Sequence, residues 1–331
     1  MNAAPSAFVL TALRHTSLIL FGAIIAVLGA LAPKFLTADN AANILIQSAP
    51  TGIVAVGMTF VLLTAGMDLS VGATMFLCAA INGKMLATGQ PMPLTLGVML
   101  AVGAGFGAVN AFFITRLRIV PFIVTLSLLF VGRGLALTIT QTRAMNLPDR
   151  FLQYGSAHWV GVPLPLVVFA IVLVVAHVVL TRTPFGRQIY ALGNHPANAL
   201  KAGIRTRRIL VAVYIISGVC AALGGILSLT QLGAVSPKFG EAYEFKAIAA
   251  AVLGGTSLFG GRGAVLPGTL LGTVLIQSIE SGLVIFNADP YLYPIVTAVV
   301  IFLAVLVDSV RNTLFARLTR RRIRHEDDLA Q

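Results

Sequence analysis

The stretch TRTPFGRQIYALGNHPANALKAGIRTRR, from Thr181 to Arg208, interrupts a chain that is otherwise apolar enough to lie in lipid. It has no acidic residue, and its basic residues are Arg182, Arg187, Lys201, Arg205, Arg207 and Arg208. Within it, Asn194 is a residue type that caps helix starts, Pro196 suits a first turn, and Gly203 favours a helix end. The stretch therefore predicts a short helix from Asn194 to Gly203 in a basic loop between two membrane spans.

The composition of the whole chain places most of the remaining residues inside a bilayer. The 331 residues are 57% hydrophobic and 10% charged, with a mean hydropathy of +0.93. Because a soluble domain carries about 25% charged residues, we predict an all-α, polytopic membrane protein. The net charge of +12 does not indicate a nucleic-acid partner, because the basic residues lie in short loops and a tail, as the positive-inside rule describes.

The apolar runs on either side of the stretch predict about ten membrane spans, since a bilayer core takes about 20 residues of helix. Their approximate bounds are Ser17–Ala32, Pro50–Asp68, Ser70–Lys84, Pro93–Thr115, Val120–Thr140, Pro163–Leu180, Ile209–Leu232, Phe245–Phe259, Ala264–Phe286 and Tyr291–Val307. Residues Asp39 to Ser48 are predicted to form a short interfacial segment before the second span.

Ten spans place both termini on one side of the membrane, and the charges indicate which side. Most lysines and arginines fall on the side of the termini, which is therefore the cytoplasm. The predicted organisation is a cytoplasmic N-terminus over 1–16, a transmembrane domain over 17–310 with a cytoplasmic loop over 181–208, and a basic cytoplasmic tail over 311–331. The first span is predicted to remain uncleaved.

Two glycine-containing segments, Gly66–Gly72 and Leu253–Gly263, break the helical pattern at membrane depth. Irregular backbone survives there only where protein or water satisfies it, and such breaks point to a transport path. Gly103 and Gly107, like Gly268 and Gly272, are spaced for close helix packing. The residues predicted to form the path or its gate are Gly66, Asp68, Leu69, Ser70, Gly72, Gly254, Gly255, Gly260, Gly261 and Gly263.

The chain lacks the sequence signatures of catalysis and of metal or nucleotide binding. No GxxxxGK[ST], HExxH, CxxC or GxSxG occurs, so we predict no catalytic residue, no metal site and no cofactor on this chain. Cys78 and Cys220 lie in apolar runs, which favours buried packing over a disulfide.

Few polar side chains fall within the predicted spans, which argues against an ion-coupled pump. They are Asp68, Asn82, Asn110, Arg133, Gln231, Gln277 and Glu280. Asp68 is interpreted first as a cap for the helix that begins near Ser70, with a role for the charge itself as the alternative. Arg133 pairs either with an acidic group or with backbone carbonyls, and the sequence leaves both open.

Three blocks in order along the chain resemble the ribose-type permeases of ABC transporters. GMTFVLLTAGMDLSVGATM (Gly57–Met75) is similar to their GxDLSVG signature, and TPFGRQIYALGNHPANALKAGI (Thr183–Ile204) resembles their cytoplasmic loop. YEFKAIAAAVLGGTSLFGGRGAVLPGTLLG (Tyr243–Gly272) resembles their third shared block. The resemblance is collinear over Thr51–Asp308. The chain departs from the family pattern at Ala65–Met67 and at Asn198–Ala199, which bears on the substrate more than on the family.

The resemblance implies a permease subunit of the cell inner membrane that imports a monosaccharide, a ribose-like pentose or a hexose, by alternating access. It implies a second copy of the permease or a close paralogue, a cytoplasmic ABC ATPase with tandem modules that holds ATP and Mg²⁺, and a periplasmic sugar-binding protein. It also assigns the short helix of the basic loop to coupling with the ATPase. The implied coupling residues are Leu192, Gly193, Asn194, Pro196, Ala199, Gly203 and Ile204.

The apolar side chains of Leu192, Ala199 and Ile204 are predicted to offer the docking surface, with the flanking arginines contacting lipid headgroups or acidic groups of the ATPase. Three alternatives remain open at this stage. They are a permease of the same superfamily for branched-chain amino acids or another small solute, a secondary transporter or channel, and a membrane scaffold that transports nothing.

Overall fold

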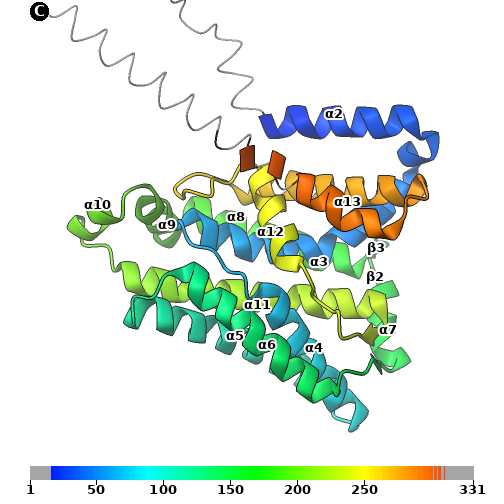
Figure 1. The fold of residues 1–331 in the computed structure, drawn as a ribbon, viewed down its shortest axis with the longest axis horizontal. Coiled ribbons are helices and arrows are strands. Elements are labelled where there is room, and N and C mark those ends of the chain that lie inside the picture. The colour runs from blue at the N-terminus through cyan, green and yellow to red at the C-terminus, as the bar shows by residue number, and fades with distance from the viewer. Residues whose placement is uncertain (1–15, 301, 304, 307–308, 310–331) are drawn as a thin grey trace, which may run out of the picture.

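The computed structural model describes residues 16–300, 302–303, 305–306 and 309, and it is a bundle of helices (Figure 1). The helices are α2 (Thr16–Leu31), α3 (Ala38–Leu63), α4 (Val71–Ala87), α5 (Met92–Arg116), α6 (Pro121–Thr140), α7 (Asp149–Ser156), α8 (Leu164–Arg182), α9 (Pro184–Asn194), α10 (Pro196–Lys201), α11 (Thr206–Leu232), α12 (Tyr243–Leu253) and α13 (Leu270–Ile285). Residues Tyr293 to Val300 are also helical. The predicted tail over 311–331, and the N-terminal segment except Thr16, lie outside the described residues.

The all-α, polytopic membrane class is confirmed. Within the described residues, six helical segments are long and apolar enough to cross a membrane, and Phe21–Leu31 and Val71–Ala87 are shorter apolar helices. The six are α3, α5, α6, α8, α11 and the segment Val265–Ile285, which joins an irregular turn to α13. The predicted bounds of the first, fourth, fifth, sixth and seventh spans agree with α2, α5, α6, α8 and α11 to within three residues.

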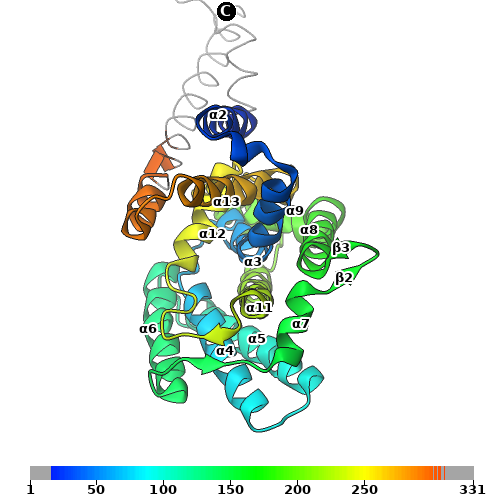
Figure 2. The ribbon, with the colours of Figure 1, turned by 90° about the vertical axis from the view of Figure 1, so that its right-hand side faces the viewer.

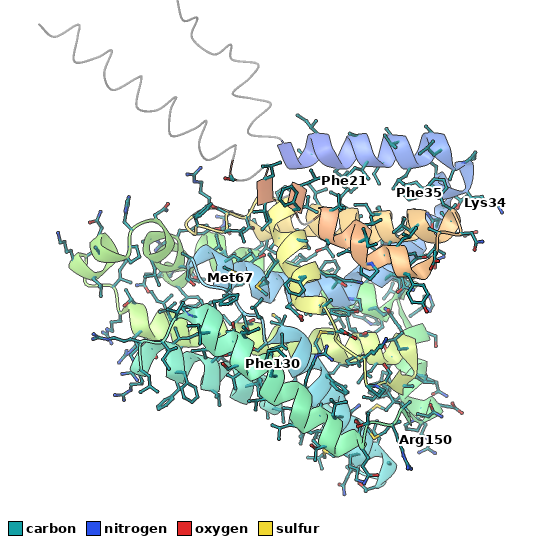
Figure 3. All side chains as sticks on the ribbon, in the orientation of Figure 1. Phe21, Lys34, Phe35, Met67, Phe130 and Arg150 are labelled. Carbon is teal, nitrogen blue, oxygen red and sulfur yellow. The ribbon has the colours of Figure 1, made fainter. Side chains whose placement is uncertain are left out.

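Helix α11 lies at the centre of the bundle, with α3 on one side of it and α4 and α5 on the other (Figure 2). The short helices α9 and α10 lie at one end of the molecule, and α7, β2 and β3 lie at the opposite end (Figure 1). Lys34 and Arg150 are at that opposite end as well (Figure 3). The basic loop that contains α9 and α10 is thus separated from these two charges by the length of the spanning helices.

Small antiparallel strand pairs tie the loops together at the end that holds α7. Strand β1 (Met145–Asn146) pairs with β4 (Ala234–Val235), and β2 (His158–Trp159) pairs with β3 (Val162–Pro163). The side chains of Tyr154 and Trp159 are exposed there, as interfacial aromatic side chains are.

The prediction of an interfacial segment followed by a span starting at Pro50 is wrong, because α3 continues from Ala38 to Leu63 with Pro50 inside it. A proline frees the carbonyl four residues earlier, and an unpaired carbonyl in an apolar environment is costly. Here the Ile46 carbonyl accepts a hydrogen bond from Gln231 Nε2 of α11 at 3.3 Å. The side chain of a distant helix therefore satisfies the group that the proline leaves free.

The predicted glycine contacts are confirmed between helices. A Cβ atom at Gly107 of α5 would overlap the Tyr214 carbonyl oxygen of α11, and one at Gly103 would overlap the Gly218 carbonyl oxygen. Gly272 is packed in the same way on the Ala250 carbonyl oxygen of α12. The glycines therefore allow the helix backbones to touch, which fixes how the central helices cross.

We expect Gly107→Leu to destabilise the fold by about 3 kcal/mol or more, because the added side chain meets rigid backbone and not a movable side chain. The measurement is the thermal unfolding temperature of the purified protein in detergent, with size-exclusion chromatography to detect aggregation. Gly105→Leu is the matched control, since a Cβ at exposed Gly105 has nothing within 4 Å. Equal unfolding temperatures for the two variants would contradict the packing argument.

Candidate functional site

The first predicted break is real: α3 ends at Leu63, and α4 begins only at Val71. The chain turns at Ala65, which has a φ of 59°, and the amide groups of Ala65 and Gly66 bond back to the last turn of α3. Helix α4 thus starts near the middle of the bundle (Figure 1). It leaves a short non-helical segment whose polar groups need partners from elsewhere in the fold.

Asp68 supplies those partners and is itself buried. Its Oδ1 accepts hydrogen bonds from the Ser70 backbone amide at 3.0 Å and from the Ser70 hydroxyl at 2.6 Å. Its Oδ2 accepts a hydrogen bond from the Ser217 hydroxyl of α11 at 2.7 Å. The local bonds to the residue before α4 agree with a capping role. The bond to α11 adds a second role, that of fixing the start of α4 to the central helix.

Two further hydrogen bonds extend this network to other helices. Asn110 Nδ2 of α5 donates to the Ser70 hydroxyl at 2.8 Å, and the Tyr214 hydroxyl of α11 donates to the Met67 carbonyl at 3.3 Å. The segment between α3 and α4 is therefore held by α5 and α11 together. Movement of α11 relative to α3 would be transmitted directly to the beginning of α4.

The second predicted break is also present, since α12 ends at Leu253, and residues up to Ala264 are not helical. The glycines of this segment are required by its backbone, because Gly255, Gly260 and Gly261 have φ values of 94°, 83° and 70°. The predicted eighth span was too long, because its last residues belong to this segment. Its Gly261 amide donates to the Leu63 carbonyl at 3.0 Å, so the two broken segments touch each other.

The basic loop contains two helices where the sequence predicted one. Asn194 is the last residue of α9 and does not cap α10, whose first residue is Pro196 and whose cap residue His195 makes no side-chain capping bond. The expected ending is correct, because α10 stops at Lys201 and Gly203 follows with a φ of 76°. The sequence pattern of α9 was not recognised, although Thr183 before Pro184 is a cap, accepting from the Gly186 amide at 3.2 Å.

The basic loop contacts both broken segments. Asn194 Nδ2 donates to the Gly261 carbonyl at 3.3 Å and also to the Tyr190 carbonyl at 3.0 Å. The Tyr190 hydroxyl donates to the Gly263 carbonyl at 2.9 Å. Burial raises the pKa of Tyr190 above its ordinary value, which keeps this hydroxyl protonated as a donor. Gly193 packs directly on the Leu63 carbonyl oxygen, where a Cβ would overlap it.

The structure therefore brings together two sets of residues that the sequence placed far apart: the loop around Gly193 and the two predicted gate segments. The side chains predicted to form the docking surface are less exposed than that prediction requires. Leu192 and Ala199 are buried inside this chain, with 5% and 3% of their surface exposed, and Ile204 is half-buried. Leu200 of α10 has 60% of its surface exposed, so it is the apolar side chain of this helix that a partner could contact.

Glu280 and Arg133, two other polar residues of the predicted spans, make different kinds of contact. Glu280 forms an ion pair with Lys246, with 2.6 Å between Oε1 and Nζ. Arg133 pairs with no acid among the described residues, and its Cζ lies 5.9 Å from the centre of the Phe76 ring. Both cysteines are free and buried, as predicted. Among the described residues, no three His, Cys, Asp or Glu side chains gather as metal ligands would.

Sequence reasoning missed Glu244, Ser217 and Tyr190. Glu244 lies directly before the span that the sequence predicts from Phe245, but it is buried in the first turn of α12. An acidic residue three positions before the apolar run from Ala247 to Leu253 is the signal that could have found it. Ser217 and Tyr190 give no such signal, because their importance depends on partners 149 and 73 residues away.

Residues 40–305 match the protein family described as "Branched-chain amino acid transport system / permease component". The chain is 37% identical to the ribose import permease protein RbsC of Haemophilus influenzae over 88% of this chain and 91% of that protein. It is 38% identical to RbsC of Escherichia coli K12, over 90% and 94%, and 35% identical to the fructose import permease protein FrcC of Rhizobium meliloti, over 88% and 82%. No solved structure matches.

Proposed function

The chain belongs to the family of the permease component of branched-chain amino acid transport systems, and from this premise we propose that it is the membrane-spanning permease subunit of an ATP-driven ABC importer for a monosaccharide. The relatives that support the sugar are named for ribose, allose, galactofuranose and fructose. The chain covers at least 79% of each of these proteins.

The observation that carries the proposal is the contact of the basic loop with both broken helical segments. A transporter driven by a separate ATPase needs a cytoplasmic element that moves with the ATPase and touches the parts that open the path. Gly193 and Asn194 meet Leu63 and Gly261 in this way. ATP binding would move α9 and α10, shift the ends of α3 and α12, and open the path by alternating access.

The partners follow from this mechanism. ATP and Mg²⁺ are held by a cytoplasmic ABC ATPase, commonly a single chain with tandem modules, and the sugar arrives on a periplasmic binding protein. A second copy of this permease or a close paralogue completes the path. The subunit crosses the inner membrane about ten times, with both termini in the cytoplasm, and carries out no catalysis itself.

Uptake into proteoliposomes tests the proposal. The permease is reconstituted with its ATPase and binding protein, and radiolabelled D-ribose, D-allose, D-fructose and L-leucine are supplied one at a time. We expect ATP-dependent uptake of a sugar and none of leucine. Leucine uptake would favour the alternative of a branched-chain amino acid permease, the substrate class that the family description names. Uptake driven by an ion gradient without ATP would instead identify a secondary transporter.

Leu200→Asp is expected to lower the affinity for the ATPase by roughly tenfold or more, because a charge would replace an exposed apolar side chain at the docking surface. The fold should be unaffected, since Leu200 is mostly exposed. The measurement is co-purification and titrated binding of the ATPase to the detergent-solubilised permease. Leu117→Asp, at an exposed leucine directly after α5, is the matched control. Unchanged affinity in Leu200→Asp would remove α10 from the docking surface.

A further inference from the structure

The two interrupted helices α4 and α12 begin beside each other near the middle of the bundle (Figure 1). The backbone of α4 touches the turn that leads into α12, because a Cβ at Gly72 would overlap the Gly240 carbonyl oxygen and a Cβ at Gly240 would overlap the Gly72 carbonyl oxygen. Glu244, in the first turn of α12, places its carboxylate directly against Gly72. Transporters often bind their solutes where discontinuous helices meet near the middle of the membrane.

The Glu244 carboxylate is incompletely satisfied. Only 5% of the residue is exposed, and its Oε2 has no hydrogen-bond partner among the described residues. A buried carboxylate oxygen without a partner is strongly unfavourable in an apolar environment. A nearby acid shows the contrast, since Glu280 of α13 pairs with Lys246. Glu244 is therefore placed to accept a hydrogen bond from a donor that the described residues do not supply.

Arg133 of α6 is the matching unsatisfied donor. Its Nη2 is buried without a hydrogen-bond partner in the described part of the chain, and the guanidinium is held over the ring of Phe76. Phe76 and Gly72 are four residues apart on α4, so they occupy one face of that helix about 6 Å apart. The free nitrogen of Arg133 and the free oxygen of Glu244 consequently flank the same face of α4.

The two groups influence each other without forming an ion pair. Arg133 exerts an attractive electrostatic effect on Glu244, which Glu241 and Asp68 oppose. The nitrogen atoms of Arg133 lie farther from the Glu244 carboxylate oxygens than the 4 Å that defines an ion pair. The ion pair among the described residues is Lys246–Glu280. An acceptor and a donor of opposite charge, held apart, make a site that is neutral overall and able to form hydrogen bonds of both kinds.

We propose that Glu244 and Arg133 are the groups of this chain that contact the neutral, polyhydroxylated solute as it passes between α4, α6 and α12. The inference rests on the proposed function and deepens it. A sugar hydroxyl donates to the Glu244 carboxylate while a neighbouring sugar oxygen accepts from the Arg133 guanidinium. The solute supplies the partners that Glu244 Oε2 and Arg133 Nη2 lack among the described residues, where both atoms are buried.

A different use of the same residues is a ligand-free latch, in which the carboxylate and guanidinium close into an ion pair in another state of the cycle. The two roles predict different effects on ATP hydrolysis and on sugar transport when these residues are substituted. A latch controls the conformational change, so its loss alters ATP hydrolysis and transport together. A solute contact acts only on the sugar, so its loss reduces the amount of sugar moved for each ATP hydrolysed.

The test uses the full complex in proteoliposomes, with the sugar that the wild-type chain transports best among D-ribose, D-allose and D-fructose. Absence of ATP-dependent sugar uptake by the wild type would refute the proposed function before any variant is considered. For Glu244→Gln and Arg133→Gln we measure sugar uptake and the ATPase activity stimulated by the loaded binding protein. We expect the ratio of sugar to ATP to fall by roughly tenfold or more in each variant, since each loses a charge-assisted hydrogen bond to the sugar. The stimulated ATPase activity should remain at the wild-type level.

Asp149→Asn is the control, because Asp149 is an exposed acid in the first turn of α7, and its ratio should equal that of the wild type. If either single variant fails to fold, E244Q/R133Q, which removes both opposite charges of this pair together, is measured in its place with the same readout. A wild-type ratio of sugar to ATP would overturn the proposal. Parallel loss of uptake and ATPase activity in a monodisperse complex would overturn it as well, in favour of the latch.

Discussion

Replacing Asp68 by alanine is expected to abolish sugar uptake, whereas Asp68→Asn should retain a measurable part of it. Alanine removes all three hydrogen bonds that the carboxylate accepts and leaves the Ser70 amide and the Ser217 hydroxyl buried without this partner. The lost stability is on the order of 4 kcal/mol, a large share of what a protein has. The start of α4 would then no longer be fixed to α11.

Asparagine keeps the acceptor oxygen that faces Ser70, and the Ser217 hydroxyl can turn to accept from the new amide group. Uptake by Asp68→Asn should therefore fall by less than about tenfold, the effect of one weakened hydrogen bond. The measurements are uptake in proteoliposomes and the thermal unfolding temperature in detergent. Asp39→Ala, at an exposed acid in the first turn of α3, controls for loss of a carboxylate. Equal losses in the alanine and asparagine variants would show that the charge itself is needed.

Gly193→Leu is expected to uncouple ATP hydrolysis from transport. The new side chain would meet the Leu63 carbonyl oxygen and displace the Gly261 amide that bonds to it. The basic loop would then be pushed away from both broken segments, while the exposed Leu200 on α10 would still reach the ATPase. We expect sugar uptake to fall by at least about a hundredfold, since backbone contacts cannot relax around a leucine.

The measurement compares sugar uptake with the ATPase activity of the assembled complex, with and without loaded binding protein. Gly134→Leu on α6 is the control, because a Cβ at this exposed glycine has nothing within 4 Å. Wild-type coupling in Gly193→Leu would mean that the path is opened by another contact. Failure of the complex to assemble would instead place Gly193 in the ATPase docking surface itself.

The spans that the sequence predicted well are those whose apolar runs end in clear signals. The runs at α5 and α8 end at arginines, and Gln141 and Gly233 end α6 and α11 in left-handed conformations. These ends depend on local chemistry, so they can be read without knowing the fold. The basic loop belongs to the same class, because its charge alone separates it from the spans on either side.

The predictions that failed involve groups whose partners are distant in sequence. Pro50 was taken as a helix start, but Gln231 of α11 satisfies the carbonyl that it frees. Asn194 was taken as a cap, but its side chain bonds to Gly261. Leu192 was taken as a docking side chain, but the fold buries it. In each case the local preference was overruled by a contact that exists only once the chain has folded.

By itself the sequence determined the membrane class and the family, and it predicts the side of the basic loop, because hydropathy and charge act on each segment separately. The tertiary structure alone decided that this loop touches both broken helices, that Asp68 is shared between α4 and α11, and that Glu244 and Arg133 flank one face of α4. The physical reason is that interrupted helices leave polar groups unpaired in an apolar environment. Their partners come from other helices, and the packing of glycines against backbone decides which helices lie close enough.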